Sequence, residues 1–126
     1  MVDALRALHA ALVPGGVVVD TQPVSPHPGV DGAGGELGLL DLREWAELIR
    51  AIDAGVDAAV AQGLFSVTHE SQFVVTDDYD DGAEFVDAAS QWAGTRIPAA
   101  LERRAAQERG TVSVHQQVRM RLLRRT

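Results

Sequence analysis

The architecture follows from the stretch Leu12-Val13-Pro14-Gly15-Gly16-Val17-Val18-Val19. Upstream of it, Leu5 and Leu8 continue back from Leu12 at helical spacing, which predicts a short helix. Proline cannot continue that helix and glycine accepts a positive φ, so the chain reverses direction at the Pro-Gly-Gly turn. The three β-branched valines that follow predict a strand covered on both faces. A helix that leads into such a strand is typical of an α/β protein.

A proline- and glycine-rich segment, residues 22–35, follows the valine strand. Pro23, Pro26 and Pro28 come first, and four glycines follow them by Gly35. Neither residue type favours the interior of a helix or a central strand, so this segment is predicted to be an irregular loop.

A long amphipathic helix is predicted next. Asp41 and Glu44 have the spacing of a capping box, and apolar residues recur at helical intervals up to about Gln62, where Gly63 ends the pattern. Residues 64–75 then alternate between apolar and other side chains, apart from a break at His69, which predicts a long strand with a bend.

The C-terminal third is predicted to contain two helices and a strand. A second capping box, Asp81 to Glu84, precedes one helix, and Pro98 suits the first turn of another that runs to Gly110. Residues 112–123 then alternate almost strictly, which predicts a strand with one polar face. That polar face comprises Ser113, His115, Gln117, Arg119 and Arg121.

Composition limits the class of protein. The chain has 126 residues, 46% of them hydrophobic, which is enough for one core, so residues 1–126 are predicted to form a single domain. It has no cysteine, which excludes disulfides and thiolate zinc sites. Its net charge of -7 disfavours nucleic acid and anionic membranes as partners. The N-terminus lacks the pattern of a signal peptide and no apolar run could span a membrane, so a soluble cytoplasmic protein is expected.

The order of these elements, with the Leu-x-Pro-Gly-Gly turn at its start, resembles the C-terminal half of class I S-adenosylmethionine-dependent methyltransferases. The resemblance implies an α/β fold in which residues 17–20, 64–75 and 112–123 are the fifth, sixth and seventh strands of that family. It further implies a small mixed three-stranded sheet in the order 5-7-6, with helices on both faces.

The resemblance also concerns the cofactor. The family binds S-adenosylmethionine on a glycine-rich loop after its first strand and on an acid after its second, and both would precede Met1. The segment Asp31-Gly32-Ala33-Gly34-Gly35 imitates such a loop, but prolines precede it where a central strand is required. We therefore expect no cofactor site, and no methyltransferase activity by this chain alone.

Few residues qualify as candidates for catalysis. If a site is inherited from the family, it lies at the carboxyl ends of the parallel strands, which implies Asp20, Gln22, His27 and Tyr79. The acidic run that starts at Asp77 lacks two oxygen ligands of a calcium loop, and the four histidines lack zinc-site spacing, so no metal site is predicted.

Three hypotheses for function remain. In the first, the strand edge at Val17, Val18 and Val19 lacks a neighbour, so the chain is a non-catalytic module that forms a homodimer or completes a partner protein. In the second, it is a small enzyme with a site in the 22–35 loop, beside His27 and Asp31. In the third, it is a fragment or subunit of a methyltransferase.

Overall fold

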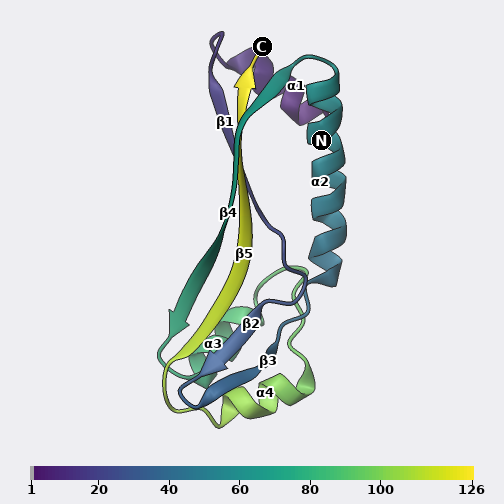
Figure 1. The fold of residues 1–126 in the computed structure, drawn as a ribbon. Helices are drawn as coiled ribbons and strands as arrows, with labels where there is room; N and C mark the ends of the chain where they lie inside the picture. The colour runs from purple at the N-terminus through teal and green to yellow at the C-terminus, as the bar shows by residue number, and fades with distance from the viewer. Residues whose placement is uncertain (1) are drawn as a thin grey trace. The chain divides into compact units, whose positions relative to one another are not determined.

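The computed structural model describes residues 2–126, which form a mixed α/β structure with an open antiparallel sheet (Figure 1). In chain order, its four helices and five strands are α1 (Val2–Ala11), β1 (Val17–Pro23), β2 (Gly29–Gly32), β3 (Gly35–Leu39), α2 (Arg43–Ala61), β4 (Phe65–Tyr79), α3 (Gly82–Ala89), α4 (Ala99–Ala106) and β5 (Val112–Arg125).

The chain divides into two compact units. Unit 1 comprises the chain up to Pro23, Glu47–Phe73 and Val118–Thr126, and unit 2 comprises Val24–Ala46 and Val74–Gln117. Because α2, β4 and β5 each contribute residues to both units, this division leaves the prediction of a single domain as it stands.

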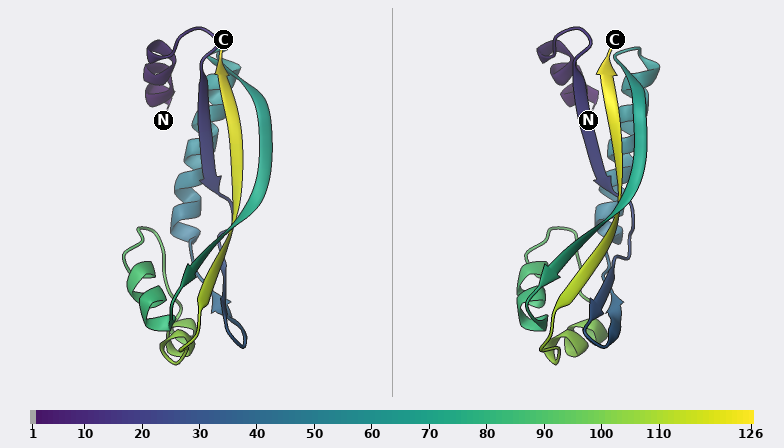
Figure 2. Two further views of the ribbon diagram at one scale, coloured as in Figure 1. Left: turned by 90° about the vertical axis from the view of Figure 1, so that its left-hand side faces the viewer. Right: turned by 60° about the vertical axis from the view of Figure 1, so that its left-hand side comes forward.

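In unit 1, β5 lies between β1 and β4 (Figure 2). Its pairing with β1 is antiparallel and runs from Val17 opposite Arg124 to Pro23 opposite Val118. Both α1 and α2 pack on one face of these strands, where they share a single core. Its buried members are Leu5, Val56, Ala59, Phe65 and Leu123.

The expectation of helices on both faces of the sheet is therefore wrong for unit 1. The α1 residue Leu5 and the α2 residue Val56 belong to the same buried cluster. On the opposite face of β1, the residues Val17 and Val19 remain 47% and 59% exposed. An uninterrupted β-branched run predicts burial on both faces, but burial depends on how many helices are placed against the sheet.

Unit 2 contains the hairpin β2–β3, and two expectations fail there. The 22–35 segment is not an irregular loop, and the sheet has five strands with antiparallel pairing instead of three in a mixed arrangement. Val30 is fully buried and pairs with Val114 of β5, so one valine provides the strand's apolar contact. Gly29 and Gly32 are the ends of β2 and Gly35 begins β3 with a φ of 129°, so the glycines that predicted a loop belong to the hairpin.

The core of unit 2 joins α3 and α4 to β2 and β5. α3 begins at the predicted cap, where Asp81 Oδ1 accepts from Glu84 N at 2.8 Å. Pro98 immediately precedes α4, which ends at Ala106 instead of continuing to Gly110. The fully buried side chains of this core include Val30, Leu40, Phe85, Ala89, Ala105 and Val112.

Candidate functional site

A buried cluster of charges occupies unit 1, between α2 and the strands β1 and β5. Arg121 donates through Nε and Nη2 to Asp20 Oδ2 at 3.0 and 2.8 Å, and through Nη2 to Asp53 Oδ1 at 3.1 Å. Arg119 donates to the same Asp53 oxygen. The side chains of Arg121 and Asp20 are only 8% and 10% exposed, so this cluster is shielded from water.

The charge cluster includes two of the residues that the resemblance implied for catalysis. Gln22 donates through Nε2 to Asp20 Oδ1 at 2.9 Å, so both oxygens of Asp20 are occupied. A carboxylate that accepts from an arginine and an amide is poorly placed to accept a proton from a substrate. The cluster thus explains Asp20 and Gln22 as residues that hold β1 against β5.

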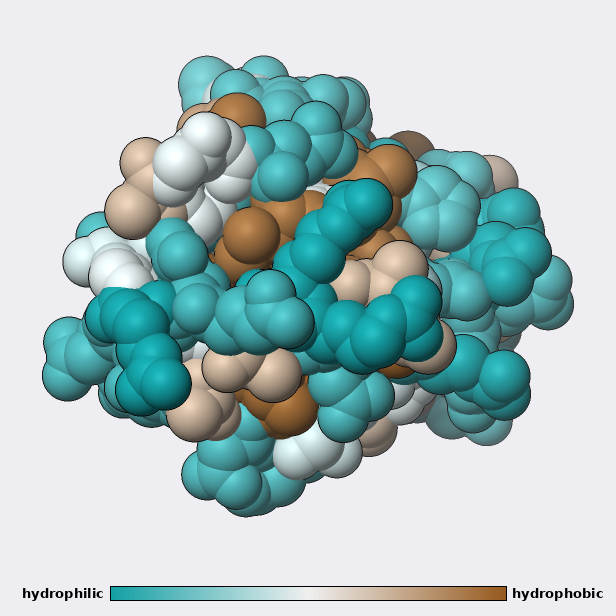
Figure 3. Space-filling model, turned by 90° about the horizontal axis from the view of Figure 1, so that it is seen from below, coloured by the Kyte–Doolittle hydropathy of each residue, from teal (hydrophilic) through white to brown (hydrophobic). Residues whose placement is uncertain are grey.

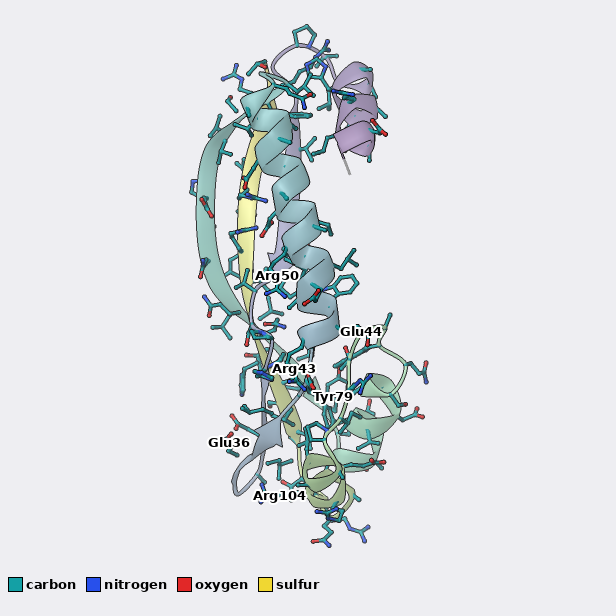
Figure 4. The ribbon with its side chains drawn as sticks, turned by 90° about the vertical axis from the view of Figure 1, so that its right-hand side faces the viewer. Glu36, Arg43, Glu44, Arg50, Tyr79 and Arg104 are labelled. Carbon is teal, nitrogen blue, oxygen red and sulfur yellow. The ribbon has the colours of Figure 1, made fainter. Side chains whose placement is uncertain are left out.

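The other two candidates belong to unit 2. His27 Nδ1 lies 3.2 Å from the carbonyl oxygen of Leu40. Tyr79, which is labelled in Figure 4, is a residue of β4. Its ring packs edge-on against Phe85, and its centroid lies 6.4 Å from that of Trp92. Burial, followed by the negative charge of nearby acids, raises the pKa of Tyr79, so its hydroxyl is neutral at physiological pH.

A row of polar side chains crosses three strands of unit 2. His115 lies at its centre, with Nδ1 3.0 Å from Thr76 Oγ1 and Nε2 2.8 Å from Asp31 Oδ2. Beside this row, Ser113 Oγ donates to Asp78 Oδ1 at 2.6 Å. Of the two residues that the hypothesis of an enzyme at the 22–35 loop named, Asp31 therefore bonds to His115, and His27 lies at the carbonyl oxygen of Leu40.

The row contains a hydroxyl, an imidazole and a carboxylate in the order of a hydrolase triad. None of the three residues lines the cavity of about 530 Å³ or the smaller pocket of unit 2 that are described below, and the side chains of His115 and Asp31 are 37% and 46% exposed. A nucleophile needs an adjacent space in which a substrate can be held against it. The arrangement therefore serves better as cross-strand hydrogen bonding between β4, β5 and β2.

One cavity of unit 2 has a volume of about 530 Å³. Both tryptophans of the chain line it, one from α2 and one from the segment after α3. Its other apolar walls are Pro28, Leu40, Leu42, Ala93 and Val114, and its polar positions are Asp77, Gln91, Thr95 and Gln116. From below, the surface is mostly hydrophilic, with apolar side chains showing in small patches (Figure 3).

The polar positions of the cavity differ in their freedom to bind a ligand. Gln116 is fixed, because its Oε1 accepts from Ser25 N at 3.2 Å and its Nε2 donates to Ser25 O at 3.3 Å. Asp77 is the sole ionisable residue in the lining, which contains no arginine, lysine or histidine. The cavity thus combines aromatic walls with one carboxylate.

A smaller pocket lies at the start of α2, lined by Asp41, Arg43, Glu44 and Arg96. Half of the predicted capping box forms there: Asp41 Oδ1 accepts from the backbone and side chain of Arg43 at 3.0 Å, whereas the Asp41 N–H donates to the carbonyl oxygen of Arg96 instead of to Glu44. This contact lowers the pKa of Asp41 well below its usual range and raises that of Arg43. Figure 4 labels Arg43 and Glu44 at this end of α2.

Trp45 and Trp92 recur with other apolar residues at helical spacing, which predicts the apolar stripes of two helices, but α3 ends at Ala89 and Trp92 lies beyond it. That both line one cavity has no local signal in the sequence, because the two tryptophans lie far apart along the chain. The acidic run likewise separates by role: Asp81 caps α3, Asp78 accepts from Ser113, and Asp77 lines the cavity.

The chain matches no protein-family model and no curated protein. Residues 2–126 contain no group of three or more side chains that could hold a metal ion, and none of their helices could cross a membrane.

Proposed function

We propose that the chain is a methyltransferase-like module without a cofactor site of its own, and that it forms a homodimer through the edge of β1. The observation that carries the proposal is the position of β1. Among residues 2–126, β1 pairs with β5 alone, so its second edge has no partner strand. Unpaired N–H and C=O groups along a strand edge favour the addition of another strand.

The chemistry of β1 favours a second copy as that strand. Its one charged residue, Asp20, is neutralised by Arg121, so two β1 strands can approach without repulsion between like charges. It carries no lysine, the residue that commonly blocks edge pairing. Antiparallel pairing about a two-fold axis would bring the same exposed valines, Val17 and Val19, from both copies together.

The resemblance to methyltransferases receives support from the strand arrangement. In unit 1, β5 pairs antiparallel with β1 and lies between β1 and β4, as the resemblance implies for the seventh strand relative to the fifth and sixth. The glycine-rich segment that starts at Asp31 lies in a hairpin between β2 and β3. No helix N-terminus follows this turn, which favours a module that binds no nucleotide there.

The molar mass in solution tests the proposal. Sedimentation equilibrium should give twice the chain mass of 13.4 kDa for the wild type. Val19→Lys places a charge on the edge strand and should yield monomers. Val13→Lys is the matched control, because Val13 is 72% exposed and lies outside the strand, and it should remain dimeric.

A wild type that stays monomeric up to its solubility limit would contradict the dimer. Equal dissociation of the Val19→Lys and Val13→Lys variants would contradict the assignment to β1. Calorimetric titration with S-adenosylmethionine tests the other half of the proposal, which requires that no heat of binding appear; micromolar binding would overturn it.

A further inference from the structure

The cavity of unit 2 is lined by both tryptophans of the chain, Trp45 and Trp92. Its volume of about 530 Å³ is in the range of sites for small organic molecules. Trp92 also packs against the core of unit 2 and lies next to Tyr79, so this wall is held in place.

The charge of the lining has one sign. Asp77 is its sole ionisable residue, and this carboxylate forms no ion pair within residues 2–126. The neighbouring acids that have hydrogen-bonding roles, Asp78 and Asp81, use their carboxylates elsewhere. No arginine, lysine or histidine lines the cavity, so an anion would find no counter-charge there.

We propose that this cavity binds a small organic cation with an apolar body, such as a quaternary ammonium ion or protonated amine that carries an aromatic ring. The faces of tryptophan rings attract cations, most strongly among the aromatic side chains. Asp77 adds a direct electrostatic attraction, and the apolar walls accept the body of the ligand. The net charge of -7 further favours the approach of a cation.

Intrinsic fluorescence provides a direct assay, because every tryptophan of the chain lines the cavity. The wild-type protein is titrated with the benzyltrimethylammonium ion, with neutral benzyl alcohol and with the anion phenylacetate. The cation should change the fluorescence and bind roughly tenfold more tightly than benzyl alcohol, while phenylacetate should bind most weakly. Equal affinity for the three ligands, or no saturable change with the cation, would overturn the proposal.

Asp77→Asn tests the carboxylate, and Asp80→Asn is its matched control. Both remove one negative charge from the same acidic run, but Asp80 does not line the cavity. Asp77→Asn should weaken the cation roughly fivefold and leave benzyl alcohol unchanged, whereas Asp80→Asn should change neither appreciably. An equal loss in both variants would show a general charge effect and refute a site at Asp77.

The single tyrosine of the chain gives a second measurement on the unmodified protein. Tyr79 lies 6.4 Å from Trp92 between ring centroids, and the charge of Asp77 contributes to its raised pKa. A cation bound beside Asp77 would offset that charge, so benzyltrimethylammonium should lower the pKa of Tyr79 and benzyl alcohol should not. The near-ultraviolet absorbance of the phenolate follows this titration, and an unchanged pKa at saturating cation would contradict binding beside Asp77.

Discussion

Arg121→Met should destabilise the protein more than any loss of a surface charge, because it breaks a buried ion pair. Arg121 as a whole residue is 6% exposed, and its guanidinium makes two hydrogen bonds to Asp20 and one to Asp53. Without it, Asp20 remains buried as a carboxylate whose other bond comes from the Gln22 amide at 2.9 Å. Removing one partner of a buried pair costs about 3–5 kcal/mol.

Urea unfolding followed by circular dichroism measures this cost. For a urea dependence of about 2 kcal/mol per molar, the midpoint should fall by about 2 M. Arg50→Met is the control, since Arg50 pairs with Glu47 at the surface with both side chains more than two-thirds exposed, and it should cost less than about 1 kcal/mol.

A double variant separates the lost charge from lost packing. Asp20→Asn combined with Arg121→Met removes both charges of the buried pair, so it should be more stable than Arg121→Met alone by about 1–2 kcal/mol. If Arg121→Met costs no more than Arg50→Met, the cluster is not shielded from water and the reasoning fails. If the double variant gains nothing, the loss arises from packing and not from the uncompensated carboxylate.

Three further predictions concern unit 2. Gly82→Ala should cost roughly 3 kcal/mol or more on urea unfolding, because its Cβ would lie 1.6 Å from a backbone oxygen of α4, whereas Gly34→Ala, with nothing within 4 Å, should be tolerated. Asp41→Asn should destabilise the protein at neutral pH, and the loss of stability should shrink progressively below about pH 4. The contact with Arg43 lowers the folded-state pKa of Asp41, so the stability that this contact contributes is present above the unfolded-state pKa and is lost on acidification. An equal loss of stability at about pH 3 would contradict this prediction. Tyr79 should titrate above its ordinary pKa of about 10 in the folded protein, and near 10 in urea. Because its folded-state pKa is raised, the stability of the protein should fall as the pH rises above about 10. Coincident titrations of Tyr79 in the two states would contradict this prediction.

The helices and long strands were predictable from residue patterns because those patterns are local. Helical spacing from Trp45 onward, alternation after Val112 and the cap at Asp81 all reflect backbone geometry over a few residues, and α2, β5 and α3 confirm them. The hairpin β2–β3 was not predictable in this way. Its strands are short and glycine-rich, and they are defined by pairing with distant residues such as Val114.

Candidate residues were predicted less successfully than elements. Asp20 and Gln22 were predicted as candidates for catalysis, but in the structure Asp20 accepts from Gln22 and from Arg121, which is 101 residues away along the chain. Arg121 was assigned to a polar face, which suggested exposure, yet it is the buried polar residue of the core. A strand's polar face becomes buried where a helix covers it, and α2 supplies Asp53 to compensate the charge.

There is a physical reason why some features of this protein follow from its sequence alone and others depend on its tertiary structure. Spacing, capping and turn chemistry follow from steric and hydrogen-bonding rules that act between neighbours in the chain, so α/β character and element order could be read directly from residues. The charge cluster around Arg121, the cavity between Trp45 and Trp92, and the choice of covered face depend on contacts between residues dozens of positions apart. Those contacts form only when the whole chain buries its apolar surface and pairs its buried charges, so they are determined by the tertiary structure and not by local sequence.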